Sequence, residues 1–176
     1  MFVGFESTLK EKSLDDTNNE YLVQNEVVCI DFDKCKNDYC EHSPGENKCG
    51  YLKSVDAIIE RGSKVYFIEF KNTKIDEKLV YEIVEKCYDS LLLYFEKTGK
   101  NISDSRQNFS FTLVTNYGNK ADAVNSKEMI VQTVVGKADE KWKKYKKKFE
   151  SFFFIGMNIF EPVVFNNYLI KERLIP

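Results

Sequence analysis

Two short apolar, β-prone runs joined by a turn constrain the fold of this 176-residue chain more than any other feature. The runs are residues 54–60 (SVDAIIE) and 65–71 (VYFIEFK), and they carry three charges at Asp56, Glu69 and Lys71. Charged side chains within apolar runs are costly to bury unless they are paired or bind an ion. These three charges could jointly hold a divalent metal and activate water.

The two runs predict a β-hairpin that brings the charges together. Residues two apart in a strand share a face, so Glu69 and Lys71 point the same way. If residues 61–64 form the connection, Asp56 lies directly across from Glu69, with Cβ atoms about 5 Å apart. A two-residue turn would instead place Asp56 opposite Phe67, with Glu69 diagonal but on the same face. Either register gathers the three charges.

The chemistry of such a cluster fits phosphodiester hydrolysis. Carboxylate oxygens suit Mg²⁺ or Mn²⁺, which keep several bound waters. The metal lowers the pKa of a bound water and offsets charge on a phosphorane-like transition state. Lys71 could orient or help deprotonate that water, and could neutralise the scissile phosphate. The alternative for the same residues is a surface hairpin that carries an ordinary salt bridge.

The pattern resembles the PD-(D/E)XK motif of the restriction-endonuclease-like nucleases. It consists of Asp56, a twelve-residue gap, and then Glu69-Phe70-Lys71. The family core is a mixed sheet flanked by helices, with the acidic hairpin at its centre and a helix after the motif. The resemblance covers about residues 50–115. It implies that the two carboxylates bind metal, that the Phe70 carbonyl is a further ligand, and that Lys71 is catalytic.

The resemblance also implies an N-terminal ligand and a function. The family often uses a glutamate from an N-terminal helix, and Glu20 or Glu26 could match, although the spacing does not choose between them. The first element of the motif departs from the family because Val55 stands where proline is common. The implied activity is a metal-dependent nuclease acting on DNA or RNA, in phage defence or a mobile element.

The rest of the chain alternates helical and strand patterns. This predicts a single domain over residues 1–176 with an α/β (α+β) fold, a central mixed sheet flanked by helices. Apolar residues at helical spacing predict a helix from Asp76 to Lys97 that ends at Gly99, with Cys87 in its buried stripe. The other predicted elements are one or two short helices within 6–26, strands at 27–33 and 109–115, an apolar stretch at 129–135, a Lys-rich helix at about 138–150, strands near 152–160 and 162–166, and a short C-terminal helix.

Four of the five cysteines fall within 21 residues, together with the only histidine. Cys35-x4-Cys40-x-His42-x6-Cys49 could make a tetrahedral Cys₃His zinc site that ties down a Cys-rich excursion at about residues 29–50. Unligated thiols are the alternative, and a disulfide or redox role is disfavoured in a reducing compartment. The cluster therefore adds structural Zn²⁺ to the expected cofactors.

A second cluster is basic. Residues 137–148 carry seven lysines at positions that leave an aromatic side for packing. The lysines expected to contact phosphates from the exposed side are Lys141, Lys144, Lys147 and Lys148. A solvated helix face is the alternative interpretation of the same lysines.

Composition limits the remaining function classes. The net charge of −2 argues against a general polyanion-coating protein, so nucleic acid would need a local basic patch. No apolar run approaches the roughly 20 residues that span a bilayer, and the N-terminus lacks a signal-peptide pattern. We therefore expect a cytoplasmic protein with no membrane role.

Two non-enzymatic functions stay open. One is a protein-binding partner, immunity- or antitoxin-like, on the same fold. The other is a zinc-stabilised interaction module. The apolar residues 152–160, if exposed, would indicate a homodimer or another protein partner.

Overall fold

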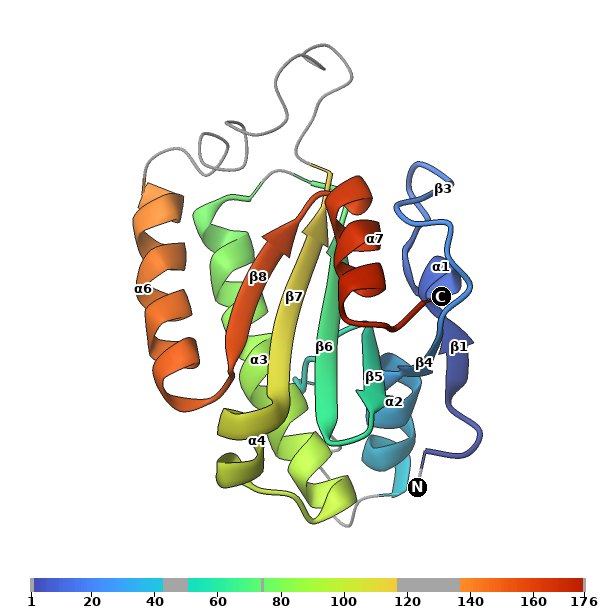
Figure 1. The fold of residues 1–176 in the computed structure, drawn as a ribbon, viewed down its shortest axis with the longest axis vertical. Coiled ribbons are helices and arrows are strands. Elements are labelled where there is room, and N and C mark those ends of the chain that lie inside the picture. Colours follow the sequence, from blue (N-terminus) through green and yellow to red (C-terminus); the bar gives the residue numbers. More distant parts are fainter. Residues whose placement is uncertain (1, 43–50, 74, 117–136, 176) are drawn as a thin grey trace.

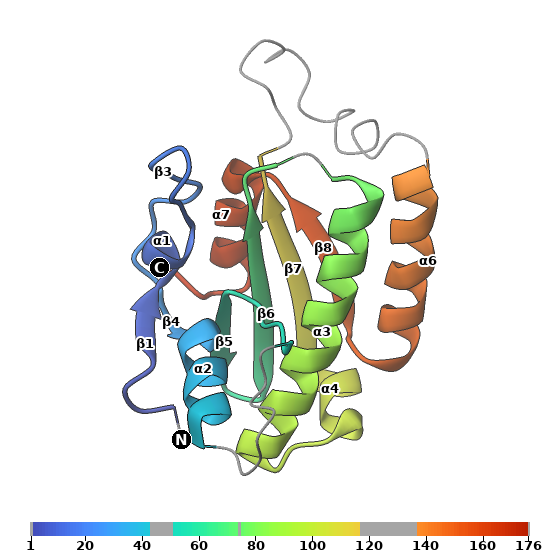
Figure 2. The same ribbon diagram turned by 180° about the vertical axis from the view of Figure 1, so that it is seen from behind.

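A mixed six-stranded β-sheet lies between two layers of helices (Figures 1 and 2). The computed structural model describes residues 2–42, 51–73, 75–116 and 137–175. Across the sheet, the strands are β1 (Glu6–Thr8), β4 (Val28–Asp31), β5 (Ala57–Arg61), β6 (Lys64–Lys71), β7 (Phe109–Thr115) and β8 (Gly156–Phe160). The strands from β1 to β6 are antiparallel to their neighbours, whereas β7 and β8 continue the sheet in parallel. The predicted α/β architecture with a mixed sheet is confirmed.

Helices cover both faces of this sheet. One face carries α2 (Phe32–His42), α3 (Glu77–Thr98) and α6 (Lys137–Phe152), as Figure 2 shows. The other carries α1 (Leu9–Lys12) and α7 (Pro162–Lys171), while α4 (Ile102–Asn108) precedes β7. Two-residue strands β2 (Leu14–Asp15) and β3 (Glu20–Tyr21) form a separate hairpin. None of the helices in the described ranges combines the length and apolarity needed to cross a bilayer.

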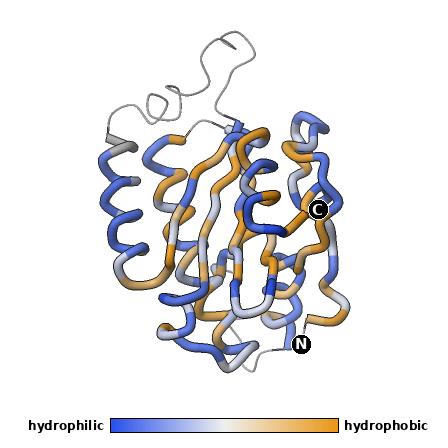
Figure 3. The backbone as a smooth tube through the Cα atoms, in the orientation of Figure 1, coloured by the Kyte–Doolittle hydropathy of each residue, from blue (hydrophilic) through white to orange (hydrophobic). Residues whose placement is uncertain are grey.

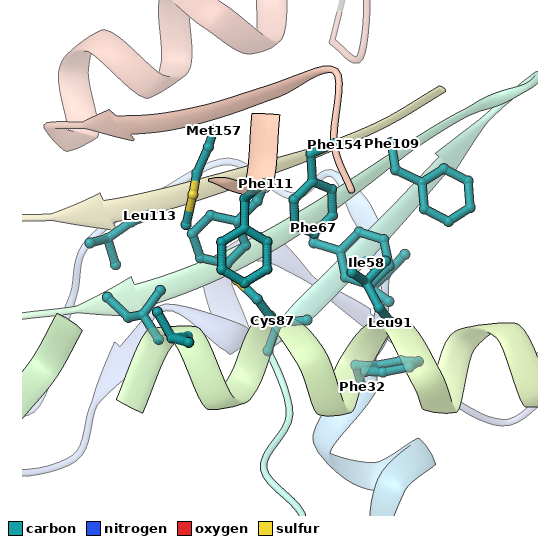
Figure 4. Packing of buried hydrophobic residues seen from close by; sticks show 14 of the residues in the cluster. Phe32, Ile58, Phe67, Cys87, Leu91, Phe109, Phe111, Leu113, Phe154 and Met157 are labelled. Atoms are coloured by element: carbon teal, nitrogen blue, oxygen red, sulfur yellow. The ribbon is translucent and has the colours of Figure 1, made fainter. Parts of the chain in front are cut away.

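The larger core lies between the sheet and the α3 layer. Phe67 of β6 and Phe111 of β7 are fully buried there, and both contact Phe154 (Figure 4). Cys87 and Leu91 of α3 belong to the same cluster. The prediction that Cys87 is a core residue is confirmed.

A smaller core on the opposite face makes β6 the central strand. Tyr66, Ile68 and Phe70 pack there with Phe165 and Leu169 of α7. Because side chains alternate between faces, a strand that is apolar on both faces has to be covered on both. This double burial surrounds the charges at the end of β6 with protein.

The sequence places the helix after the hairpin accurately. Asp76 caps the start of α3, where its side chain accepts a hydrogen bond from Leu79 N at 2.8 Å. Gly99 ends the helix in the left-handed region at φ 70°, which glycine adopts without a Cβ clash. The predicted strand at 109–115 coincides with β7.

The N-terminal segments differ from the prediction. Residues 6–26 form β1, the single-turn α1 and the β2–β3 hairpin instead of one or two helices ending near Glu26. The described part of the Cys-rich excursion predicted at 29–50 is regular: β4 leads directly into α2. Helix α2 buries only Phe32 and Cys35, so its apolar periodicity is too weak to signal a helix.

The C-terminal prediction is partly wrong. The Lys-rich helix exists as α6, but it extends to Phe152, and the strand that follows starts only at Gly156. The strand predicted at 162–166 is the first half of α7. Pro162 occupies the first turn of this helix, where its missing N–H costs nothing. The apolar stretch at 129–135 lies outside the described residues.

Adjacent leucines on α3 test the core assignment. Leu91 is 2% exposed and Leu92 is 66% exposed. We expect Leu91→Ala to lower the free energy of unfolding by about 2–5 kcal/mol because it leaves a cavity. Leu92→Ala should stay within about 0.5 kcal/mol of the wild type. Urea unfolding followed by circular dichroism measures both values, and equal losses would contradict the assigned face of α3.

Candidate functional site

The β5–β6 hairpin has the register that brings Asp56 beside Glu69. Ala57 pairs with Ile68, so Asp56, one residue earlier, lies opposite Glu69 and the first of the two predicted registers is confirmed. The predicted connection is residues 61–64, but Arg61 pairs with Lys64, so the turn itself is only two residues long. Gly62 occupies the first central position with φ 60°, as a type II′ hairpin turn requires.

The Asp56 carboxylate ends the ladder between β5 and β6. Its Oδ2 accepts a hydrogen bond from Phe70 N at 2.6 Å. If the ladder continued, Phe70 would pair with Val55. Val55 N instead donates a hydrogen bond to Ser90 Oγ of α3 at 2.9 Å. In an antiparallel ladder the N–H and C=O of one residue point to the same side. The Phe70 carbonyl therefore faces the Asp56 side of β6 as well.

The Glu69 carboxylate is fully buried, at 0% exposure, on the α3 side of β6. Its Oε1 accepts a hydrogen bond from Lys86 Nζ at 2.6 Å and lies 3.2 Å from Lys71 Nζ. Lys86 Nζ also lies 3.5 Å from Asp56 Oδ1, so one ammonium bridges both carboxylates. Among the described residues, none donates a hydrogen bond to the buried Glu69 Oε2. This oxygen keeps its lone pairs available for a cation.

Burial and mutual repulsion raise the pKa of both carboxyl groups. Burial and the charge of Asp56 raise the pKa of Glu69 to about 8, because both disfavour the ionised form. Burial also raises the pKa of Asp56, against the opposing effects of the Lys86 charge and the Phe70 hydrogen bond. Burial alone would lower the pKa of Lys86, but the two carboxylates raise it above its usual range. Strongly shifted groups of this kind cluster at functional sites.

A polar cleft of about 510 Å³ opens beside the acidic pair. Asp56 and Lys71 line one wall, and the β2–β3 hairpin with the residues before it lines the other. Asn72 Nδ2 donates to Asp15 Oδ2 at 2.7 Å and ties the two walls together. The Lys71 side chain is 29% exposed, whereas Glu69 lies behind it. A ligand in the cleft would therefore meet Lys71 and Asp56.

Sequence reasoning missed Lys86, the residue most closely bound to both carboxylates. A signal for it was present in the helical pattern. Ile83 and Cys87 are buried on α3. Lys86 lies three residues after Ile83 and directly before Cys87. Positions three and four apart share a helix face, so this lysine interrupts the apolar stripe. A charge within a buried stripe needs a partner, and here the partners come from the hairpin.

A second charged cluster borders the same cleft. Lys12 of α1 lines the cleft, and its Nζ lies 2.9 Å from Asp31 Oδ1 and 3.4 Å from Asp33 Oδ2. Ser54 Oγ donates to Asp33 Oδ1 at 2.6 Å. Asp31 Oδ2 also lies 3.6 Å from Lys34 Nζ, so the two aspartates balance the charges of both lysines. Lys12 therefore holds acidic groups near Asp56 and offers little net charge to a phosphate.

The structure brings neither predicted N-terminal glutamate to the acidic pair. Glu20 is exposed in β3, and the Oε1 of the exposed Glu26 lies 3.1 Å from Lys10 Nζ. The physical reason is the hairpin in this segment, which replaces the helix expected to carry the ligand. From the N-terminal part of the chain, the charges of Lys12 in α1 and of Asp33 at the start of α2 act on Asp56.

The proposed zinc ligands are spread along α2. Cys35 is buried in the core, Cys40 is half-buried and His42 is exposed, while Cys49 lies outside the described residues. Helical residues five apart point about 140° away from each other, so Cys35 and Cys40 face different sides. Burial raises the pKa of Cys35 to about 11, which favours the neutral thiol. The described ligands do not converge, and structural zinc stays a prediction.

The four predicted phosphate-binding lysines divide into two pairs. Lys141 and Lys148 lie over tyrosine rings of α3, at 4.5 Å and 5.3 Å from the ring centres. They hold α6 against α3 by cation–π contacts. Lys144 and Lys147 are exposed on α6, whose described part is hydrophilic along most of its length (Figure 3). The second pair alone offers uncommitted side chains for nucleic acid.

The oxygen atoms at the acidic pair fit a hard divalent cation. Asp56, Glu69 and the Phe70 carbonyl are oxygen ligands, which suit Mg²⁺ or Mn²⁺. The unpartnered Glu69 Oε2 is consistent with this use. Within the described ranges, no group of three or more His, Cys, Asp and Glu side chains converges on a point. A bound ion would therefore complete its shell with water, as Mg²⁺ commonly does.

No family model, curated protein or solved structure matches the chain, so the case for its chemistry rests on the side chains themselves.

The buried glutamate predicts a pH dependence of stability. Because the folded chain raises the Glu69 pKa from 4.5 to about 8, it holds a proton that the unfolded chain releases. The free energy of unfolding should therefore fall as the pH rises from about 4.5 to about 8. Urea unfolding in metal-free buffer across this range should show a flatter dependence for Glu69→Gln. The exposed control Glu96→Gln should keep the wild-type slope, and an identical slope in all three proteins would contradict the assignment.

Proposed function

We propose that this protein is a metal-dependent nuclease that hydrolyses phosphodiester bonds. The observation that carries the proposal is the fully buried Glu69, whose Oε2 has no donor among the described residues, beside Asp56 at the edge of a polar cleft. A fold seldom buries two acidic groups together without a role for them. A divalent cation would relieve their repulsion, and the cleft gives a phosphate access to them.

Each residue of the motif has a role in this proposal. When bound, Mg²⁺ or Mn²⁺ would lower the pKa of a bound water and offset charge on the reacting phosphate. Asp56, Glu69 and the Phe70 carbonyl would hold the ion. Lys71 stands at the cleft side of the pair, where its contact with Glu69 at 3.2 Å fixes its ammonium. From there it can bind a phosphate oxygen or orient the attacking water.

The connectivity supports placing the protein among the restriction-endonuclease-like nucleases. The strands β4, β5 and β6 form an antiparallel meander, α3 follows, and β7 returns parallel to β6. The acidic hairpin lies in the middle of a mixed sheet, and a helix follows the motif, as the resemblance implies. We propose this family on that basis, with DNA or RNA as the substrate.

A non-catalytic protein-binding role is the second candidate. The observation that favours it is the pairing of Glu69 with two lysines of the chain itself, Lys86 at 2.6 Å and Lys71 at 3.2 Å. Such pairs can stabilise a degenerate site that no longer uses metal. This candidate predicts a protein partner and no cleavage of any nucleic acid.

Cleavage assays separate the two candidates. We expect the wild type to cleave plasmid DNA or RNA in Mn²⁺ and Lys71→Ala to be slower by about 10²-fold or more, because it loses a group that acts on water or phosphate. Lys64→Ala, at the opposite end of β6, is the matched control and should cleave at the wild-type rate. Retained cleavage in Lys71→Ala would overturn the mechanism, and an inactive wild type would favour the non-catalytic role.

The exposed lysines of α6 predict salt-dependent nucleic-acid binding. The double variant Lys144→Ala/Lys147→Ala should bind more weakly, and the slope of log affinity against log salt should fall by about 2, because each lost phosphate contact removes about 0.9. Fluorescence anisotropy with a labelled duplex measures this slope. The charge-matched control is Lys64→Ala/Lys171→Ala, on the α7 side of the sheet. Equal changes in both double variants would exclude α6 as the specific contact surface.

A further inference from the structure

The ammonium of Lys86 occupies the position between the two acidic side chains. Its Nζ lies 2.6 Å from Glu69 Oε1 and 3.5 Å from Asp56 Oδ1. The side chains of Lys86 and Asp56 are each 16% exposed, and Glu69 is fully buried. No other lysine within the described residues contacts both carboxylates. The chain thus supplies its own cation to the acidic pair.

This internal cation and a divalent ion would share the same two carboxylates. Two positive charges within one small, weakly solvated space repel each other strongly. Lys86 takes Glu69 Oε1 and Asp56 Oδ1, so it contacts both acids that a bridging ion would contact. A divalent ion can therefore enter only if the ammonium moves away.

The position of Lys86 on α3 puts the carboxylate of a second acidic residue within reach of its ammonium. Glu82 lies four residues earlier, on the same face of the helix, and its side chain is 34% exposed. Its present contact with the exposed Lys78 is long, at 3.8 Å. The four-carbon stem of lysine lets the ammonium move toward water while the stem stays packed. Lys86 can thus leave the acidic pair without leaving its charge buried.

We infer that Lys86 is a resident cation that competes with the divalent metal for Asp56 and Glu69, and that metal binding requires its withdrawal. The inference rests on the proposed metal site and adds its regulation. Lys86 makes the metal-free fold stable and lowers metal affinity. It is a positioning residue, because it acts through the carboxylates.

Metal affinity tests the inference without any activity assay. Isothermal titration calorimetry with Mn²⁺ should show that Lys86→Met binds the ion about tenfold more tightly or better than the wild type, because no charge-assisted hydrogen bond has to break. Lys86→Arg keeps the charge and should bind like the wild type or more weakly. Lys78→Met removes an exposed charge from the same helix and should stay within about twofold, because solvent and salt screen it.

The outcomes separate this inference from the proposed function. Equal or weaker Mn²⁺ binding by Lys86→Met would overturn the competition and leave the metal site standing. An absence of binding in both proteins, with unchanged circular dichroism, would overturn the metal site and the competition together. Loss of the added affinity in Lys86→Met/Glu69→Gln would locate the effect at the acidic pair.

A measurement on the wild type covers the case in which Lys86→Met does not fold. The ammonium resonance of Lys86 can be followed by NMR with ¹⁵N-labelled lysine and assigned with Lys86→Arg. We expect Mg²⁺ to shift this resonance or broaden it as the ammonium leaves Glu69 for solvent. A lysine resonance that stays unchanged while the backbone amide signals of Asp56 and Glu69, followed in a uniformly ¹⁵N-labelled sample, respond to Mg²⁺ would overturn the inference.

Discussion

The burial of two acidic groups side by side is the constraint on which this structure depends. Glu69 is fully enclosed, and Asp56 faces it from the position just before β5. Two like charges in a poorly solvated place cost free energy unless a proton or cation shares them. The protein meets this cost with Lys86 and with a raised Glu69 pKa of about 8.

Helix α3 builds most of this arrangement. It supplies Lys86 to the carboxylates and Ser90 to the Val55 N–H, so that β5 cannot continue alongside the end of β6. Asp89 accepts a further hydrogen bond from Lys53 N at 2.9 Å and holds the segment before β5. The opposite face of α3 anchors α6 through tyrosines. Helix α3 therefore contacts the acidic pair through Lys86, ends the β5–β6 pairing through Ser90, and packs against the basic helix α6.

The sequence was informative wherever a pattern is local. Strand alternation and the hairpin connection are enough to predict that Asp56 and Glu69 share one face, directly opposite or diagonal, and helical periodicity with its end at Gly99 predicts α3. The partners of the pair were not predictable in this way. Tertiary packing alone brings Lys86 into contact with Asp56 and the charge of Asp33 near it. The β2–β3 hairpin replaces the expected helix in a polar segment with no clear period. The α2 helix was missed because it buries too few residues to show a stripe.

Anomalous diffraction from a crystal soaked in Mn²⁺ tests the central claim most directly, because it locates the ion without reference to activity. We predict a manganese peak between Asp56 and Glu69, at coordination distances of about 2.0–2.2 Å from their oxygens. We also predict that Lys86 Nζ has moved away from both carboxylates. A saturating soak that leaves no peak there, with Lys86 still bridging Asp56 and Glu69, would contradict the claim.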